Sequence, residues 1–193
     1  MKSSTLFQLS GVAAIIAGVA YLTDTILDFT HPGNLLGVGL WVSLFGLHGL
    51  TGLFLRQREP GGILNIIGYI LNFTGLSALI GVVFVNNFIV PKLDAGINQA
   101  LFSGPTLAAF ITVGVVYLSG VLVFGTAIWR NGIFSRPATA LYMLGSIPVA
   151  LPPVFSAHIV TIGGVLISVS LIWFGCQLWQ ENKTTFNLAA DAV

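Results

Sequence analysis

The sequence predicts an all-α membrane protein, a single-domain bundle of six transmembrane helices over residues 1–193. Hydrophobic residues make up 55% of the chain and charged residues only 7%, whereas about a quarter of the residues in a soluble domain are charged. The seven basic and six acidic residues leave five long stretches without charge. A helix needs about 20 apolar residues to cross a bilayer, so four of these stretches hold one crossing each and the last holds two.

The first three expected helices are bounded by residues typical of turns. The first spans residues 6–27 and ends at the stretch 28–33, which contains proline and glycine. The second spans residues 34–55. Because only the charged segment 56–61 separates it from the third helix, at residues 62–90, these two helices should be antiparallel neighbours.

The second half begins with a more polar connection, residues 91–104. Its apolar residues Leu93, Ile97 and Leu101 recur every fourth position, which predicts a short amphipathic helix on the membrane surface. The remaining crossings are expected at residues 105–129, 137–151 and 157–179. Pro148 is expected to interrupt the second of these, because proline has no N–H to donate to the helix.

The third expected helix carries its small and polar residues on one side. At about 100° per residue, these residues share a narrow sector: Asn65, Gly68, Asn72, Gly75 and Asn86. Amides and glycines favour contact with protein, and bulky apolar residues favour contact with lipid. We therefore expect this helix to be the central one of the bundle.

Basic residues predict the orientation. In a six-crossing arrangement one side of the membrane receives Lys2, Arg56, Arg58, Arg130, Arg136 and Lys183, and the other receives only Lys92. Basic residues concentrate on the cytoplasmic side, so both termini are expected in the cytoplasm. The chain is then a multi-pass protein of the cell membrane, the plasma or inner membrane.

Several functional classes are excluded. A net charge of +1 does not provide the basic surface of a nucleic-acid-binding protein. The single cysteine, Cys176, excludes a multi-cysteine metal site. Motifs for nucleotide binding, serine hydrolysis and zinc proteolysis are absent from the sequence, which names no cofactor, metal site or catalytic residue. A non-enzymatic protein is expected, with an intramembrane enzyme using Asp24 and His158 as a lesser alternative.

The first candidate site lies at the outer end of the first helix. Asp24, Asp28 and His31 share one helical face, and Tyr21 continues that face inward. Three residues of later helices should reach the same depth: Asn86, Asn87 and His158. Such a cluster could bind an ion or a small molecule, and Asp24 should pair with one of these groups because an unpaired carboxylate is costly in the membrane. The alternative is that Asp28 and His31 are ordinary residues of a helix end.

The second candidate is His48, which lies well inside the second helix. If the helical hairpin turns near residue 60, His48 lies opposite Asn72, and an imidazole-to-amide hydrogen bond is expected. We interpret this pair as a structural clamp, because it lacks the carboxylate or second ligand that catalysis or metal binding usually needs.

Two turns resemble those of a known group of proteins. The first reads Phe124-Gly125-Thr126-Ala127, then Arg130, Gly132, Ile133 and Arg136-Pro137-Ala138, and the second is the stretch Gly49 to Gly68. Both are similar to turns of small, uncharacterised multi-pass bacterial membrane proteins. The resemblance implies a membrane bundle and no particular activity.

Two functions are compatible with these features. The first is an integral membrane protein that binds or passes a small molecule or ion through a polar cavity opening outward. The alternative is a structural or accessory subunit of a larger membrane complex, or of a homo-oligomer, in which the polar faces are contact surfaces. In either case the lipid bilayer is the expected partner.

Overall fold

The computed structural model describes residues 3–30 and 38–190, and in these ranges the chain is helical without strands, which confirms the predicted all-α class. The α-helices are α1 (Ser3–Thr30), α2 (Val38–Arg56), α3 (Arg58–Phe84), α4 (Ala95–Leu101), α5 (Gly104–Asn131), α6 (Arg136–Ala150) and α7 (Ala157–Ala190). Three short helical turns complete it: the π-helix η1 (Val85–Ile89) and the 3₁₀ turns η2 (Val90–Lys92) and η3 (Pro152–Val154).

Five of the described helices are long and apolar enough to cross a membrane: α1, α2, α3 with its extension to Lys92, α5 and α7. The expected fifth crossing corresponds to α6, which has 15 residues. At about 1.5 Å per residue it is about 22 Å long, which is shorter than the hydrocarbon core of about 30 Å. The structure therefore shows a bundle with five membrane-capable helices and one shorter helix.

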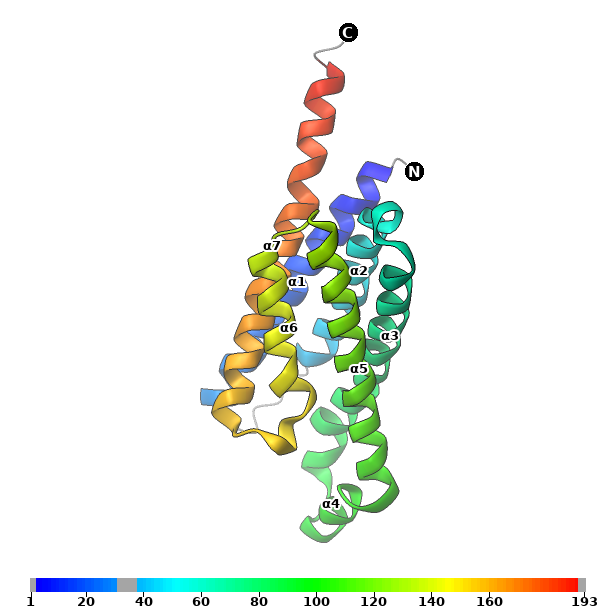
Figure 1. The fold of residues 1–193 in the computed structure, drawn as a ribbon. Helices are drawn as coiled ribbons and strands as arrows, with labels where there is room; N and C mark the ends of the chain where they lie inside the picture. Colours follow the sequence, from blue (N-terminus) through cyan, green and yellow to red (C-terminus); the bar gives the residue numbers. More distant parts are fainter. Residues whose placement is uncertain (1–2, 31–37, 191–193) are drawn as a thin grey trace.

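The six longer helices form a closed ring. Each packs against the next along the chain, with α4 left aside, and α7 closes the ring by packing along α1. Neighbouring helices run in opposite directions, so both described chain ends lie at one end of the bundle and α4 lies at the other (Figure 1). The expected hairpin of α2 and α3 is one side of this ring.

The expectation that the third helix is central was wrong, because α3 is one wall of the ring and the least buried of the five long apolar helices. The sequence pattern did predict most of its buried face, which consists of Asn65, Gly68, Asn72 and Gly75, whereas Asn86, expected on the same face, is exposed. Its other sides carry exposed isoleucines, including Ile63 and Ile70. A central helix needs buried residues all round, and α3 has only this one buried face.

Glycines allow the closest approaches between ring helices. A Cβ atom at Gly120 of α5 would collide with the backbone of Asn72 in α3 and lie 2.6 Å from the backbone carbon of Leu71. On the opposite seam, a Cβ at Gly175 of α7 would lie 2.6 Å from the carbonyl oxygen of Gly11 in α1. Small residues stabilise membrane bundles because they bring helix backbones into contact. The α3–α5 and α1–α7 contacts are the most extensive of the ring.

Buried amides hold the end of the bundle that carries the termini. Gln57, between α2 and α3, donates from Nε2 to Oδ1 of Asn65 at 2.6 Å. Asn131, the last residue of α5, donates from Nδ2 to Oε1 of Gln57 at 3.4 Å. Gln57 and Asn65 are fully buried, so these bonds satisfy groups that would otherwise be costly in the bundle. They join the α2–α3 turn to the end of α5.

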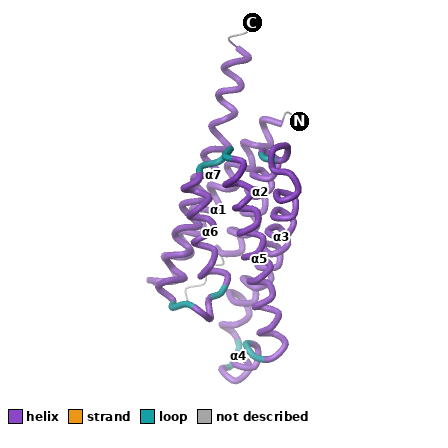
Figure 2. The backbone as a smooth tube through the Cα atoms, viewed as in Figure 1, coloured by secondary structure: helices purple, strands orange, loops and turns teal. Residues whose placement is uncertain are grey.

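The α5–α6 turn and the end of α6 are determined by glycine and proline. Gly132 has a left-handed backbone (φ 66°) and caps α5, and its N–H donates to the carbonyl of Ile128 at 3.2 Å. The expected interruption at Pro148 was wrong, because α6 continues through it to Ala150. Pro148 lies in the last turn, so little helix remains after the lost hydrogen bond. Pro152 and Pro153 then form η3, and the connections on both sides of α6 are short (Figure 2).

The connection between α3 and α5 leads away from the ring. The predicted amphipathic helix is present as α4, shorter than the segment 91–104 that contains it. Phe102, after α4, packs against Phe110 of α5 with the rings tilted by 32° and their centroids 5.5 Å apart. The expected first residues of the second helix, 34–37, lie outside the described residues, and α7 continues to Ala190 rather than ending at 179.

The close helix contacts at glycine predict that the same substitution, glycine to alanine, changes the stability of the protein very differently at two positions. Gly120→Ala should destabilise the protein by about 1–3 kcal/mol, because its methyl group overlaps the α3 backbone and the helices must separate. Gly81→Ala is the matched control, since a Cβ there meets nothing within 4 Å. Unfolding of both variants in the same detergent would measure the difference. Equal stabilities would show that the α3–α5 seam is looser than described.

Candidate functional site

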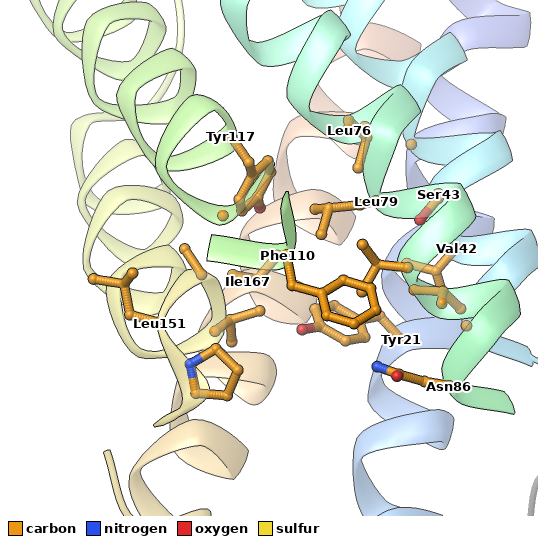
Figure 3. A pocket seen from close by; sticks show the side chains of 18 of the residues that line it. Tyr21, Val42, Ser43, Leu76, Leu79, Asn86, Phe110, Tyr117, Leu151 and Ile167 are labelled. Carbon is orange, nitrogen blue, oxygen red and sulfur yellow. The ribbon is translucent and has the colours of Figure 1, made fainter. Parts of the chain in front are cut away.

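A cavity of about 350 Å³ lies inside the ring. Residues of all six ring helices line it, together with Phe102 and the two prolines of η3. Figure 3 shows Tyr21 and Phe110 across its middle, with Tyr117, Leu76 and Leu79 on one side of them and Asn86 on the other. The volume is within the range of about 300–1,000 Å³ that is typical of small-molecule sites.

Most of the lining is aliphatic or aromatic. Five aromatic side chains face the cavity: Tyr21, Phe102, Phe110, Tyr117 and Tyr142. Among the described lining residues, Asp24 is the single charged side chain, and none is lysine, arginine or histidine. The cavity thus combines a largely apolar wall with a few polar groups, as ligand sites usually do.

Asp24 lies beside the first turn of α2. Its carboxylate accepts a hydrogen bond from the backbone N–H of Gly39. A Cβ atom at Gly39 would lie 3.0 Å from Oδ2 of Asp24 and 3.6 Å from Nδ2 of Asn87, so both side chains converge on this glycine. Backbone N–H groups in a first helical turn lack partners within the helix and favour negative charge. The sequence analysis considered only side chains as partners for Asp24 and therefore missed Gly39.

The residues of the first candidate site are divided between two environments. Tyr21, Asp24 and Asn86 line the cavity, and Asn87 lies next to it at Gly39. Asn86 and Asn87 both belong to η1, whose wide turn replaces regular α-helix there.

Two other members of that candidate site lie apart from the cavity lining. Asp28 is exposed. His158 is also exposed, and its ring packs edge-on against Phe29 with centroids 5.7 Å apart. His31 falls outside the described residues. In the part of the chain that the structure describes, no three histidine, cysteine, aspartate or glutamate side chains are grouped to hold a metal ion.

The structure gives His48 and Asn72 partners other than each other. His48 is exposed on the outer surface, and its Nδ1 donates to the carbonyl oxygen of Leu44 at 2.9 Å. Asn72 is fully buried and donates from Nδ2 to the hydroxyl of Tyr142 at 2.8 Å. The expected hydrogen bond fails because the side chains face different ways: Asn72 points into the ring toward α6, and His48 points out of it.

A buried polar network borders the cavity. Ser146 donates its hydroxyl proton to the carbonyl oxygen of Tyr142, one turn earlier in α6, at 2.8 Å. Tyr117 must therefore be the donor in its 3.3 Å bond to the Ser146 oxygen. Oδ1 of Asn72 has no protein partner among the described residues. The sequence analysis missed Tyr117, Tyr142 and Ser146, although a tyrosine and a serine four residues apart in an apolar helix could have signalled them.

A packed layer separates this network from the end that carries the termini. Its largest side chains are at most 1% exposed: Phe124, Ile128, Phe174 and Leu178. Phe174 also contacts Tyr142 and Phe134 through edge-to-face ring contacts, with centroids 6.2 and 5.7 Å apart. The cavity therefore lies on the α4 side of the bundle, and the other side is filled by side chains.

The fold and cavity define a helical bundle with several membrane-capable helices and an internal small-molecule-sized space. No protein-family model, curated protein or solved structure matches the chain. The resemblance at the two turns therefore leads to no family, and the function has to be argued from the cavity.

The network predicts unequal effects for two tyrosine substitutions. Tyr142→Phe should cost about 1–3 kcal/mol, because it leaves the buried amide of Asn72 without its acceptor. Tyr69→Phe is the matched control and should cost less. Tyr69 is only partly buried, and its partner Thr51 keeps a 2.8 Å bond to the carbonyl of Leu47. Chemical unfolding of both variants measures the difference, and similar losses would contradict the assigned network.

Proposed function

We propose that this protein is a six-crossing protein of the plasma or inner membrane, with cytoplasmic termini, that binds a small molecule in a cavity open to the outside. The observation that carries the proposal is the cavity itself, which has the size of a ligand site and is lined by every helix of the ring. A space of this size in a packed bundle is unusual, because protein interiors contain few voids larger than a water molecule.

The position of α6 supports a sixth crossing. It lies between α5 and α7 in the ring and runs antiparallel to both (Figure 1). If its two neighbours cross the bilayer, α6 must connect their opposite ends, and η3 adds length to its 15 residues. Packing against the ring helices allows irregular backbone at that depth.

The charges support an outward opening. Four arginines lie at the end opposite α4: Arg56, Arg58, Arg130 and Arg136. Basic residues favour the cytoplasmic side, and the guanidinium of Arg136 lies 5.9 Å from the ring centre of Trp129, a residue type enriched at membrane interfaces. Asp24 and Asn86 then lie on the outer half.

The packed layer favours binding over passage. Phe124, Ile128 and Phe174 are fully buried and pack together in the cytoplasmic half of the ring. A solute that enters from outside would meet this layer. We therefore favour a binding protein over a channel.

The accessory-subunit alternative rests on His48. This imidazole is exposed on the outer surface of α2, well inside an apolar helix, and lipid tails cannot satisfy its second nitrogen. A partner subunit or a second copy could do so. Recovery of the protein only together with other membrane proteins would favour this alternative.

The binding proposal predicts that filling the cavity abolishes ligand binding. Gly46 lines the cavity, and a Cβ there meets only Leu76, at 3.4 Å, so Gly46→Leu should fold with its side chain in the cavity. The purified protein in lipid nanodiscs is screened against a panel of neutral and charged small molecules by thermal stabilisation. Molecules that stabilise the unmodified protein should fail to stabilise Gly46→Leu.

Gly81→Leu is the matched control, because the same side chain there points into open space on the outside of α3. It should keep the full ligand response. If Gly46→Leu folds and responds to the same molecules as the unmodified protein, binding occurs elsewhere and the proposal is wrong.

The orientation predicts a labelling pattern. In a Cys176→Ala background, a cysteine at the exposed Gln99 of α4 should react with a membrane-impermeant maleimide in intact cells. A cysteine at the exposed Glu59, at the α2–α3 turn, should react only after the membrane is permeabilised. The reverse pattern would place the termini and the arginines outside.

A further inference from the structure

We infer that the ligand of this cavity is an organic cation, a molecule with one positively charged ammonium-type group on an apolar body. The inference rests on the proposed binding function and specifies its ligand class. It is drawn from three features of the lining: its charge, the hydrogen bonding of its carboxylate and its aromatic content.

Among the lining residues that the structure describes, one carries a negative charge and none carries a positive charge. Asp24 is the charged residue among the described lining residues, and the arginines gather at the opposite end of the bundle. The low-dielectric walls strengthen the field of this carboxylate inside the cavity. An anionic ligand would be repelled there, and a neutral one would leave the charge uncompensated.

The carboxylate has capacity left for a ligand. The N–H of Gly39 occupies one acceptor position, whereas an ionised carboxylate has about four. Asn87 lies near the same glycine, without a hydrogen bond to Asp24. Within the described ranges this carboxylate has one backbone partner. A charge in the membrane with so few partners is incompletely satisfied, and a cation would compensate it directly.

The rest of the lining suits an organic body better than a metal ion. Ca²⁺ needs about six to eight oxygen ligands and Mg²⁺ needs a compact octahedron, whereas here one carboxylate faces mainly aliphatic and aromatic groups. Aromatic faces attract ammonium groups, and Tyr21, Phe110 and Phe102 lie in the lining with Asp24. The charged group would sit near Asp24 and Asn86, with the apolar body directed past Tyr21 toward Leu76 and Leu79.

The test compares two probes of the same shape. Benzyltrimethylammonium is a cation, and in neopentylbenzene a carbon atom replaces its nitrogen. Dissociation constants are obtained from thermal stabilisation in lipid nanodiscs, at the free aqueous concentration of each probe. The cation should bind at least about tenfold more tightly than its neutral counterpart, as expected for a carboxylate partner in a partly dry site.

Two aspartates of α1 provide matched variants. Asp24→Asn keeps the shape and an acceptor for Gly39 but removes the charge, so it should weaken cation binding at least about tenfold and leave the neutral probe unchanged. Asp28→Asn removes a charge one turn away, at an exposed residue outside the lining, and should change cation binding much less than Asp24→Asn and leave the neutral probe unchanged.

A gain of affinity tests the same inference without removing any group. Asn86 lines the cavity, so Asn86→Asp adds a second carboxylate to the lining and should tighten cation binding. This variant decides the question if Asp24→Asn does not fold.

The outcomes separate the ligand class from the binding function. If both probes bind equally and Gly46→Leu abolishes both, the cavity binds ligands but not as a cation site, and the inference alone is overturned. If neither probe binds, or if Asp24→Asn folds and binds the cation unchanged, the inference is also overturned. The panel screen with Gly46→Leu then decides the binding function separately.

Discussion

Direct contact between helix backbones at glycine is the constraint on which this structure depends. Lipid tails are as apolar as leucine, so helices in a membrane gain little from burying apolar surface against each other, and close packing must hold them together. The chain provides such contact at several seams: at Gly120 between α3 and α5, at Gly11 with Gly175 between α1 and α7, and at Gly145 with Gly163 between α6 and α7. The α3–α5 and α1–α7 contacts are the most extensive. Because these backbone contacts hold the ring closed, its interior on the α4 side does not have to be filled.

The cavity lies where the closed ring is not filled by large side chains. Toward the termini, large side chains such as Phe124 and Phe174 fill the ring, and the amides of Gln57 and Asn65 tie its turns together. Toward α4, small residues such as Gly46 and Gly114 face the interior, and α6 ends early at its prolines. The two ends of one bundle are thus built differently: one is packed and hydrogen-bonded, and the other encloses a cavity whose described lining includes one carboxylate.

The sequence predicted the elements better than their arrangement. Charge-free stretches located the helices, since a bilayer constrains composition directly, and periodicity identified the buried face of α3 from Asn65 to Gly75. Periodicity shows which side of a helix is buried against protein. It does not show which other helix that side contacts. Asn72 was therefore assigned to His48, in the other helix of the same hairpin, whereas its partner is Tyr142, 70 residues away. Two features depend on closure of the ring: the pairing of Asp24 with the backbone of Gly39, and the cavity itself. No local sequence pattern predicts that closure.

The π-helix η1 has a consequence for how such a protein can change over evolutionary time. A π-turn holds one more residue than an α-turn, so a single deletion within Val85–Ile89 would restore a regular helix and rotate the rest of that helix by about 100°. Such a deletion would lie beyond Gly68 and Gly75, so the seam with α5 would be preserved. The surroundings of Asn86, which lines the cavity, would change while the seam was kept. Single-residue insertions and deletions at this one turn can therefore alter the residues that line the cavity near η1 without disturbing the contacts of α3 with α5.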